Sequence, residues 1–139
     1  MNKHLFVFLA AIALHYHTTA QLTTRENAKG HVKDLYDKAD NDLAFGKVQQ
    51  SDSLLGDAVK EKDNFIDAWI LKGQINLEYL NNYNEATRCY EKVKLLSLDY
   101  LSDVNFQLGK CYMYLGNYAT ARTCLKTFLT REKINAQSR

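Results

Sequence analysis

The sequence contains one phrase twice, as NNYNEATRCYEKV at residues 81–93 and as GNYATARTCLKTF at residues 116–128. Both copies read Asn-Tyr, two residues, Ala, two residues, Cys and an apolar residue, and the second begins 35 residues after the first. The same step taken backwards reaches a fainter copy, GKVQQSDSLLGDAV, in which Gly46 aligns with Asn81 and Gly116. The chain therefore repeats one structural unit three times.

The apolar spacing inside each copy is helical. Tyr83, Ala86, Tyr90 and Val93 follow one another at steps of three, four and three residues, which places them on one stripe of a helix. A second apolar stripe comes before the repeated phrase and is clearest over residues 106–113, just ahead of a Leu-Gly-Asn turn. Each unit is predicted to be a helix, a tight turn and a second helix.

Small residues at matching places explain how the two helices of a unit pair. Antiparallel helices approach closely only where a small side chain faces the partner and large side chains interdigitate around it. The turns have support as well, because Gly46 and Gly116 accept backbone angles that other residues resist, and Asn82 precedes Glu85 like a helix cap. The expected small pairs are Ala39 with Ser51, Gly73 with Ala86, and Gly109 with Ala121.

These residues resemble the tetratricopeptide repeat, whose pattern is Trp, Leu-Gly and Tyr on the first helix and Gly-x-Tyr, Ala and an aromatic residue on the second. The resemblance implies an all-α solenoid of about three antiparallel helix pairs in a right-handed superhelical stack. The pairs are expected at about 30–63, 66–98 and 102–131, after a lead-in over 21–29 and before a polar tail over 132–139. The step of 35 residues and the lack of proline depart from the family pattern. The residues expected to pack the repeats are Ala39, Trp69, Gly73, Tyr83, Ala86, Tyr90, Gly109, Tyr112, Tyr118 and Ala121.

The first twenty residues have the layout of a cleaved secretory signal. Lys3 and His4 open the segment, an apolar run follows over residues 5–14, and small residues stand before Gln21. The apolar run is about half of the roughly 20 residues that a membrane-spanning helix needs. We therefore expect cleavage after Ala20, export to the periplasm or outer membrane, and no membrane span in the mature chain. The alternative is a buried N-terminal helix.

The resemblance implies that the first helices of the units line a concave groove for a protein or peptide partner. Some members of the family bind acidic chaperone tails with a clamp of Lys, Asn and Arg, but here Tyr36, Asp40, Asp103 and Gln107 occupy those places, and the acidic residues would repel such a tail. The groove residues expected to contact a partner are Tyr36, Asp40, Ile70, Gln74, Leu77, Asp103, Phe106, Lys110, Met113 and Tyr114.

Other functional classes have little support in the sequence. The net charge of +2 comes from interleaved charges of both signs, which does not indicate nucleic-acid binding. No phosphate-binding loop, CxxC pair or HExxH motif is present, and His31 is the one histidine beyond the signal, so we expect no catalysis, cofactor or metal. His31 itself lies in a polar stretch that predicts a solvated surface position.

The signal followed by repeats also resembles the start of Bacteroidota cell-envelope proteins in which such repeats precede a β-propeller and an OmpA-like domain. That likeness implies an envelope scaffold, either short and standalone or part of a longer protein. A glycan-binding relative is the less favoured alternative, because those proteins carry a lipidation cysteine after the signal. The apolar side of the last helix, near Phe128 and Leu129, predicts self-association or a partner at that edge.

Cys89, Cys111 and Cys124 allow two interpretations. In an oxidising compartment Cys111 could pair with Cys124 or with Cys89. Helix axes pack about 8–10 Å apart, whereas bridged Cα atoms must lie within about 7 Å, so we favour three buried free thiols.

Overall fold

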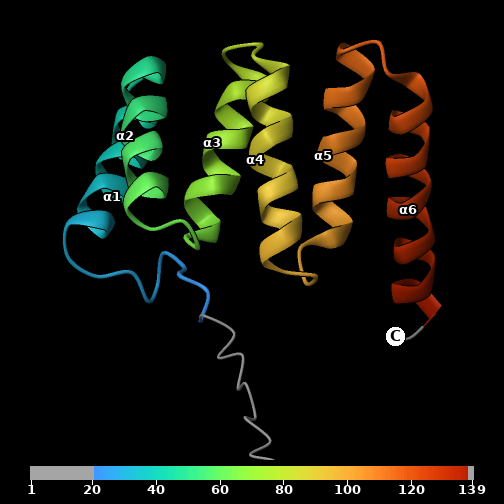
Figure 1. The fold of residues 1–139 in the computed structure, drawn as a ribbon, viewed down its shortest axis with the longest axis horizontal. Coiled ribbons are helices and arrows are strands. Elements are labelled where there is room, and N and C mark those ends of the chain that lie inside the picture. Colours follow the sequence, from blue (N-terminus) through green and yellow to red (C-terminus); the bar gives the residue numbers. More distant parts are fainter. Residues whose placement is uncertain (1–20, 138–139) are drawn as a thin grey trace, which may run out of the picture.

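The computed structural model describes residues 21–137, so the predicted signal lies outside the described residues. Six helices follow in chain order: α1 (His31–Ala44), α2 (Val48–Glu61), α3 (Ile66–Glu78), α4 (Tyr83–Leu96), α5 (Leu101–Tyr114) and α6 (Tyr118–Gln137). They pair as α1 with α2, α3 with α4, and α5 with α6, and the three hairpins stand side by side (Figure 1). The described chain is an all-α solenoid of helical hairpins, as the repeat predicted.

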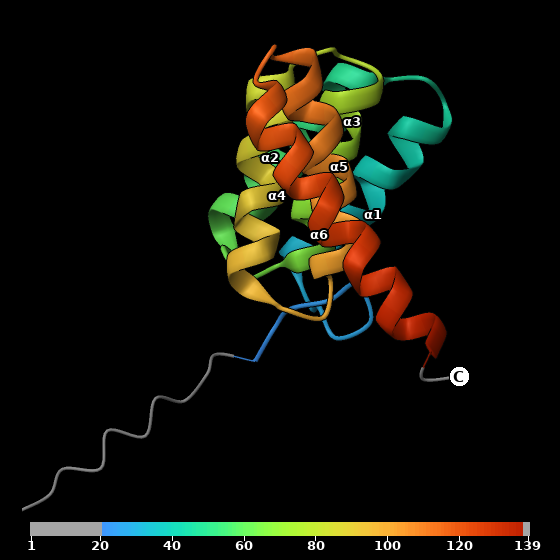
Figure 2. The same ribbon diagram turned by 90° about the vertical axis from the view of Figure 1, so that its right-hand side faces the viewer.

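The hairpins are joined by contacts of α2 with α3 and of α4 with α5. Seen along the row, α1, α3 and α5 lie on one side of the stack and α2 and α4 on the other (Figure 2). The first helices of the units therefore share one face of the molecule, and this is the face on which the sequence places the groove.

The turn inside each hairpin has a left-handed residue at the aligned position. The φ angles of Gly46, Asn81 and Gly116 are 73°, 53° and 75°. Glycine has no Cβ to oppose this conformation, and asparagine is among the few other residues that adopt it readily. The predicted cap is confirmed, because the side chain of Asn82 accepts a hydrogen bond of 3.3 Å from the backbone N–H of Glu85.

Small residues stand where the two helices of a hairpin meet. Ala39 and Ser51 are fully buried, and the Ser51 hydroxyl donates a 2.7 Å hydrogen bond to the Ala39 carbonyl. A Cβ added at Gly73 would lie 3.0 Å from Cζ of Tyr90, and one added at Gly109 would lie 2.6 Å from Cδ2 of Leu125. The third hairpin thus has no room for even a methyl group at this contact.

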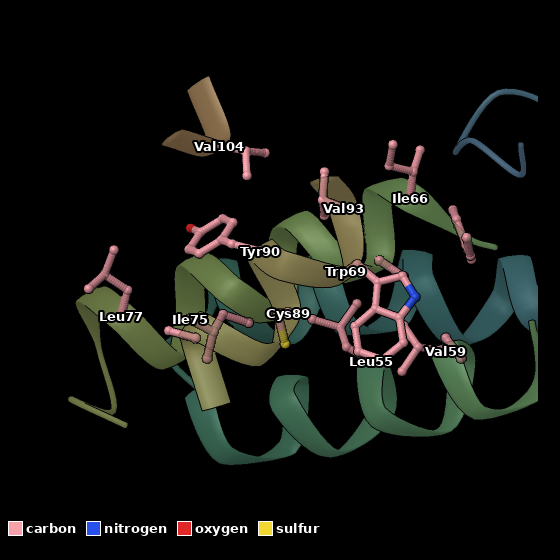
Figure 3. Close-up of a cluster of buried hydrophobic side chains, with 14 of the residues drawn as sticks. Leu55, Val59, Ile66, Trp69, Ile75, Leu77, Cys89, Tyr90, Val93 and Val104 are labelled. Atoms are coloured by element: carbon pink, nitrogen blue, oxygen red, sulfur yellow. The ribbon is translucent and has the colours of Figure 1, made fainter. Parts of the chain in front are cut away.

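A continuous apolar core links the hairpins. Figure 3 shows Trp69 of α3 next to Leu55 and Val59 of α2, and Val104 of α5 next to Tyr90 of α4. Trp69 is 4% exposed, and its Nε1 donates a 2.8 Å hydrogen bond to the Asp63 carbonyl in the loop between α2 and α3. The same side chains that fill the core therefore set how one hairpin follows the next.

One charged contact crosses between the first two hairpins. Lys72 of α3 is buried, and its ammonium lies 2.6 Å from the Asp52 carboxylate of α2. Asn76, also buried, donates to the same carboxylate oxygen at 2.5 Å. The Lys72 ammonium also donates to the Asp52 backbone carbonyl at 3.3 Å and lies 3.7 Å from Glu85, and such additional partners are what make a buried cation tolerable.

Two expectations about the last hairpin were wrong. Tyr118 was expected to pack the repeat, but it is 71% exposed. Its counterpart Tyr83 stacks on Tyr114 of the following hairpin, with ring centroids 4.5 Å apart, and no such following helix stands beside Tyr118 in the described chain. The third unit was also expected to end at 131 before a tail, whereas α6 continues to Gln137.

The cysteine interpretation that we favoured is confirmed, because Cys89, Cys111 and Cys124 are free and buried. Burial raises the pKa of the Cys89 thiol to about 12, so the reactive thiolate is scarce at neutral pH. These thiols act as packing groups.

The glycine at the closest helix contact gives a stability test. Gly109→Ala should lower the free energy of unfolding by about 1–3 kcal/mol, because the new methyl group collides with Leu125. Gly56→Ala is the matched control, since only the Lys72 Nζ lies within reach, at 3.8 Å, and alanine should there raise the free energy of unfolding by about 0.5–1 kcal/mol. Urea unfolding of both variants checks this, and equal effects would contradict the packing account.

Candidate binding groove

A cavity of about 300 Å³ lies between the first helices of the second and third hairpins. Residues of α3 form one wall, residues of α5 form the other, and Tyr90 of α4 contributes from behind. The lining residues are Ile70, Gln74, Glu78, Tyr90, Tyr100, Asp103, Val104 and Gln107. We call this the α3–α5 cavity.

The α3–α5 cavity combines apolar walls with hydrogen-bond acceptors. Ile70 and Val104 supply aliphatic surface. Glu78 and Asp103 supply carboxylates, and the Lys110 ammonium lies 3.3 Å from Glu78. Gln107 has a buried side-chain oxygen without a hydrogen-bond partner within residues 21–137. The arrangement can hold an apolar group and pair with donors around it.

The lead-in over 21–29 packs on the loop that precedes α3. The Thr23 N–H donates to the Asn64 carbonyl at 3.0 Å, and the Ile66 N–H donates to the Thr23 carbonyl at 2.9 Å, forming an isolated parallel bridge around Phe65. The Asn64 side chain also donates to the Gln21 carbonyl at 2.8 Å. Backbone pairing thus fixes the lead-in against the second hairpin.

Arg25 of the lead-in lies on the groove face of α1. Its guanidinium carbon is 5.4 Å from the centre of the Tyr36 ring, and its nitrogens are 3.0 Å from Asp40 and 3.7 Å from Asp37. The Arg25 backbone N–H donates a 2.6 Å hydrogen bond to Asp67 at the start of α3. A segment of the chain itself therefore occupies the first part of the groove face.

Next to this arginine lies a second hollow, of about 320 Å³, lined in part by Tyr36, Asp67 and Tyr100. Tyr100 also lines the α3–α5 cavity, so one side chain borders both spaces. Tyr100 therefore separates the hollow beside the lead-in from the α3–α5 cavity.

The structure brings only part of the expected groove set together. Ile70, Gln74 and Asp103 line the α3–α5 cavity. Tyr36 is buried beneath Arg25 and against Phe65, and Leu77 is 3% exposed in the core, so these two side chains offer little surface to a partner. Leu77 was misplaced because its apolar character serves the core that α3 shares with both of its neighbours.

The remaining expected residues lie apart from the α3–α5 cavity. Asp40 lies with Arg25 on α1. Phe106 contacts the ring of Phe128 on α6 at 5.2 Å, and Tyr114 stacks on Tyr83. Lys110 reaches Glu78, and Met113 is 50% exposed near the end of α5.

Five residues that line the cavity were missing from the expected groove set: Glu78, Tyr90, Tyr100, Val104 and Gln107. Tyr100 precedes α5 in the loop, outside the helical positions used to place the groove. Glu78 is the last residue of α3, one position beyond Leu77. The signal that could have found Tyr100 is its position as an aromatic residue directly before a first helix.

Comparison with protein families agrees with this geometry. The tetratricopeptide repeat family model matches residues 66–100 and 102–135, which are the second and third hairpins. The second and third hairpins are tetratricopeptide repeats. The matched units hold both walls of the α3–α5 cavity, while the first hairpin has the same architecture outside the match. No significant match to the chain was found among curated proteins.

Over residues 21–137 no group of three potential metal ligands comes together. No helix in that range has the length and apolar character needed to cross a bilayer.

The contacts of Arg25 give a prediction about the stability of the chain. Arg25→Ala should lower the free energy of unfolding by about 0.5–1 kcal/mol, because it removes a half-exposed ion pair and a cation–π contact. Arg122→Ala, on the exposed surface of α6, should leave stability unchanged. Thermal unfolding compares the two, and a loss of similar size in both variants would show that Arg25 does not hold the lead-in.

Proposed function

We propose that the chain is a non-enzymatic interaction module that binds an extended segment of a partner protein in the α3–α5 cavity. Tetratricopeptide repeats generally mediate protein–protein interactions and scaffolding. The observation that carries the proposal is the cavity of about 300 Å³ whose walls come from two successive first helices.

The size and lining of the α3–α5 cavity suit a side chain of a peptide better than a large ligand. Ile70, Val104 and Tyr100 can cover the apolar part of such a side chain, while Gln74 and Asp103 stand at hydrogen-bonding positions around it. Specific binding then comes from one or two anchored side chains, with the rest of the segment lying along the groove face.

We propose further that the partner is a protein of the bacterial cell envelope. This rests on the signal-like layout of residues 1–20, with its basic start, short apolar run and small residues before Gln21. An exported repeat module of this kind would act as a scaffold in the periplasm or at the outer membrane.

A second candidate function is assembly through the outer side of α6. Tyr118 and Leu129 are 71% and 56% exposed on this side of the helix. In the earlier units the matching side of the second helix is covered by the next hairpin, as Tyr83 is by Tyr114. This edge would take a second copy of the chain or a helix of a larger assembly.

Capture from envelope extract distinguishes the two candidates. Immobilised residues 21–139 should retain partners that are lost with the Ile70→Ala and Gln74→Ala double variant, which removes contacts in the α3–α5 cavity while keeping helix-favouring residues. The matched control, Tyr118→Ser with Leu129→Ser on α6, should retain them. The reverse pattern would favour assembly through α6 and contradict groove binding.

A further inference from the structure

We infer that the partner segment is basic, with an arginine or lysine side chain seated in the α3–α5 cavity. This inference rests on the proposed function and names the chemistry of its partner. It follows from unpaired acidic groups, from an unsatisfied acceptor, and from the way the chain already binds its own Arg25.

The groove face has more carboxylates than cations. Asp103 lines the α3–α5 cavity and makes no ion pair with any described residue. Asp67, which lines the neighbouring hollow together with Arg25, accepts the backbone N–H of Arg25 but makes no side-chain ion pair within residues 21–137. Glu78 is paired with Lys110 at 3.3 Å, and Asp40 is paired with Arg25 at 3.0 Å. A cation entering the α3–α5 cavity would meet the Asp103 carboxylate, whose charge is free to pair, and Asp67 lies in the hollow on the other side of Tyr100.

A second observation points to a hydrogen-bond donor. The side-chain oxygen of Gln107, on a wall of the α3–α5 cavity, is buried without a donor in the described chain. Leaving a buried acceptor unpaired costs free energy, and a ligand N–H that the Gln107 side chain turns to meet would recover it. Guanidinium and ammonium groups carry several donors and no acceptor.

At the first hairpin, Arg25 shows how the groove face binds a basic side chain. Its guanidinium lies on the aromatic face of Tyr36 and beside Asp40 and Asp37, while its backbone bonds to Asp67. The α3–α5 cavity repeats these elements with an aromatic ring, Tyr100, and a carboxylate, Asp103. Because Tyr100 borders both spaces, a partner segment that continues the path of the lead-in places its basic side chain there.

The charge of the whole chain does not produce this preference. The formal net charge is +2, which on its own would weakly repel a basic peptide. Selective binding of a basic segment must therefore come from local carboxylates, and the acidic tails that other tetratricopeptide repeats bind would be repelled by Asp103 and Asp67.

Fluorescence anisotropy with three labelled peptides tests the inference on residues 21–139. The probe is a short peptide of Arg, Leu and Ser, and its twins carry Glu or Gln in place of every Arg. The basic probe should bind most tightly, and added salt should weaken it. Asp103→Asn should weaken it by about fivefold, the loss expected for one partly screened charge pair. Asp57→Asn, which removes the same charge from the exposed surface of α2, should not.

Each alternative outcome is decisive. Equal affinity for the three peptides, tighter binding of the acidic twin, no detectable binding of the basic probe, or equal losses with Asp103→Asn and Asp57→Asn would overturn the basic-segment inference. The groove itself is judged separately, because capture that depends on Ile70 and Gln74 would still support the proposed function after any of these results.

Discussion

The close contact between the two helices of each hairpin is the constraint on which the rest of the structure depends. Gly109 faces Leu125 so closely that an added Cβ would lie 2.6 Å from the leucine, and Gly73 faces Tyr90 in the same way at 3.0 Å. In the first hairpin, Ala39 and Ser51 are the small, fully buried residues at the contact, and the Ser51 hydroxyl donates a hydrogen bond to the Ala39 carbonyl. Small residues therefore fix the separation of the helices, and large ones fill the space around them.

From that contact the packing extends to the neighbouring hairpins and then to the groove. Tyr90 illustrates the chain of effects, because it packs against Gly73 within its hairpin, lies next to Val104 of the following hairpin, and forms the back of the α3–α5 cavity. The shape of the cavity is thus a consequence of how α3, α4 and α5 pack. Burial raises the pKa of the Tyr90 hydroxyl, so this group stays protonated at neutral pH.

Periodicity in the sequence predicted what repeats from one unit to the next. The step of 35 residues placed Gly46, Asn81 and Gly116 at equivalent turns, and all three have left-handed backbones. What belongs to one unit alone could not be predicted in this way. The burial of Tyr36 depends on Arg25 of the lead-in, and the exposure of Tyr118 depends on the lack of a following hairpin beside it in the described chain.

The candidate site was harder to predict than the fold, because a cavity depends on contacts between units. Helical positions correctly brought Ile70, Gln74 and Asp103 together, but they also selected Leu77, whose side chain lies in the core. Tyr100 is a loop residue and has no helical position to mark it. Lys72 shows the same limit, since the Asp52 carboxylate that pairs with it lies on α2 and reaches it only when α2 packs on α3.

Backbone amide shift mapping tests the central claim most directly, namely that a partner binds between α3 and α5. Isotope-labelled residues 21–139 would be titrated with the captured partner or with the basic probe peptide, and the shifted amides would be assigned. The account predicts that the largest shifts cluster at Ile70, Gln74, Asp103 and Gln107. Shifts confined to α6 around Tyr118 and Leu129, with the α3–α5 cavity unaffected, would contradict it.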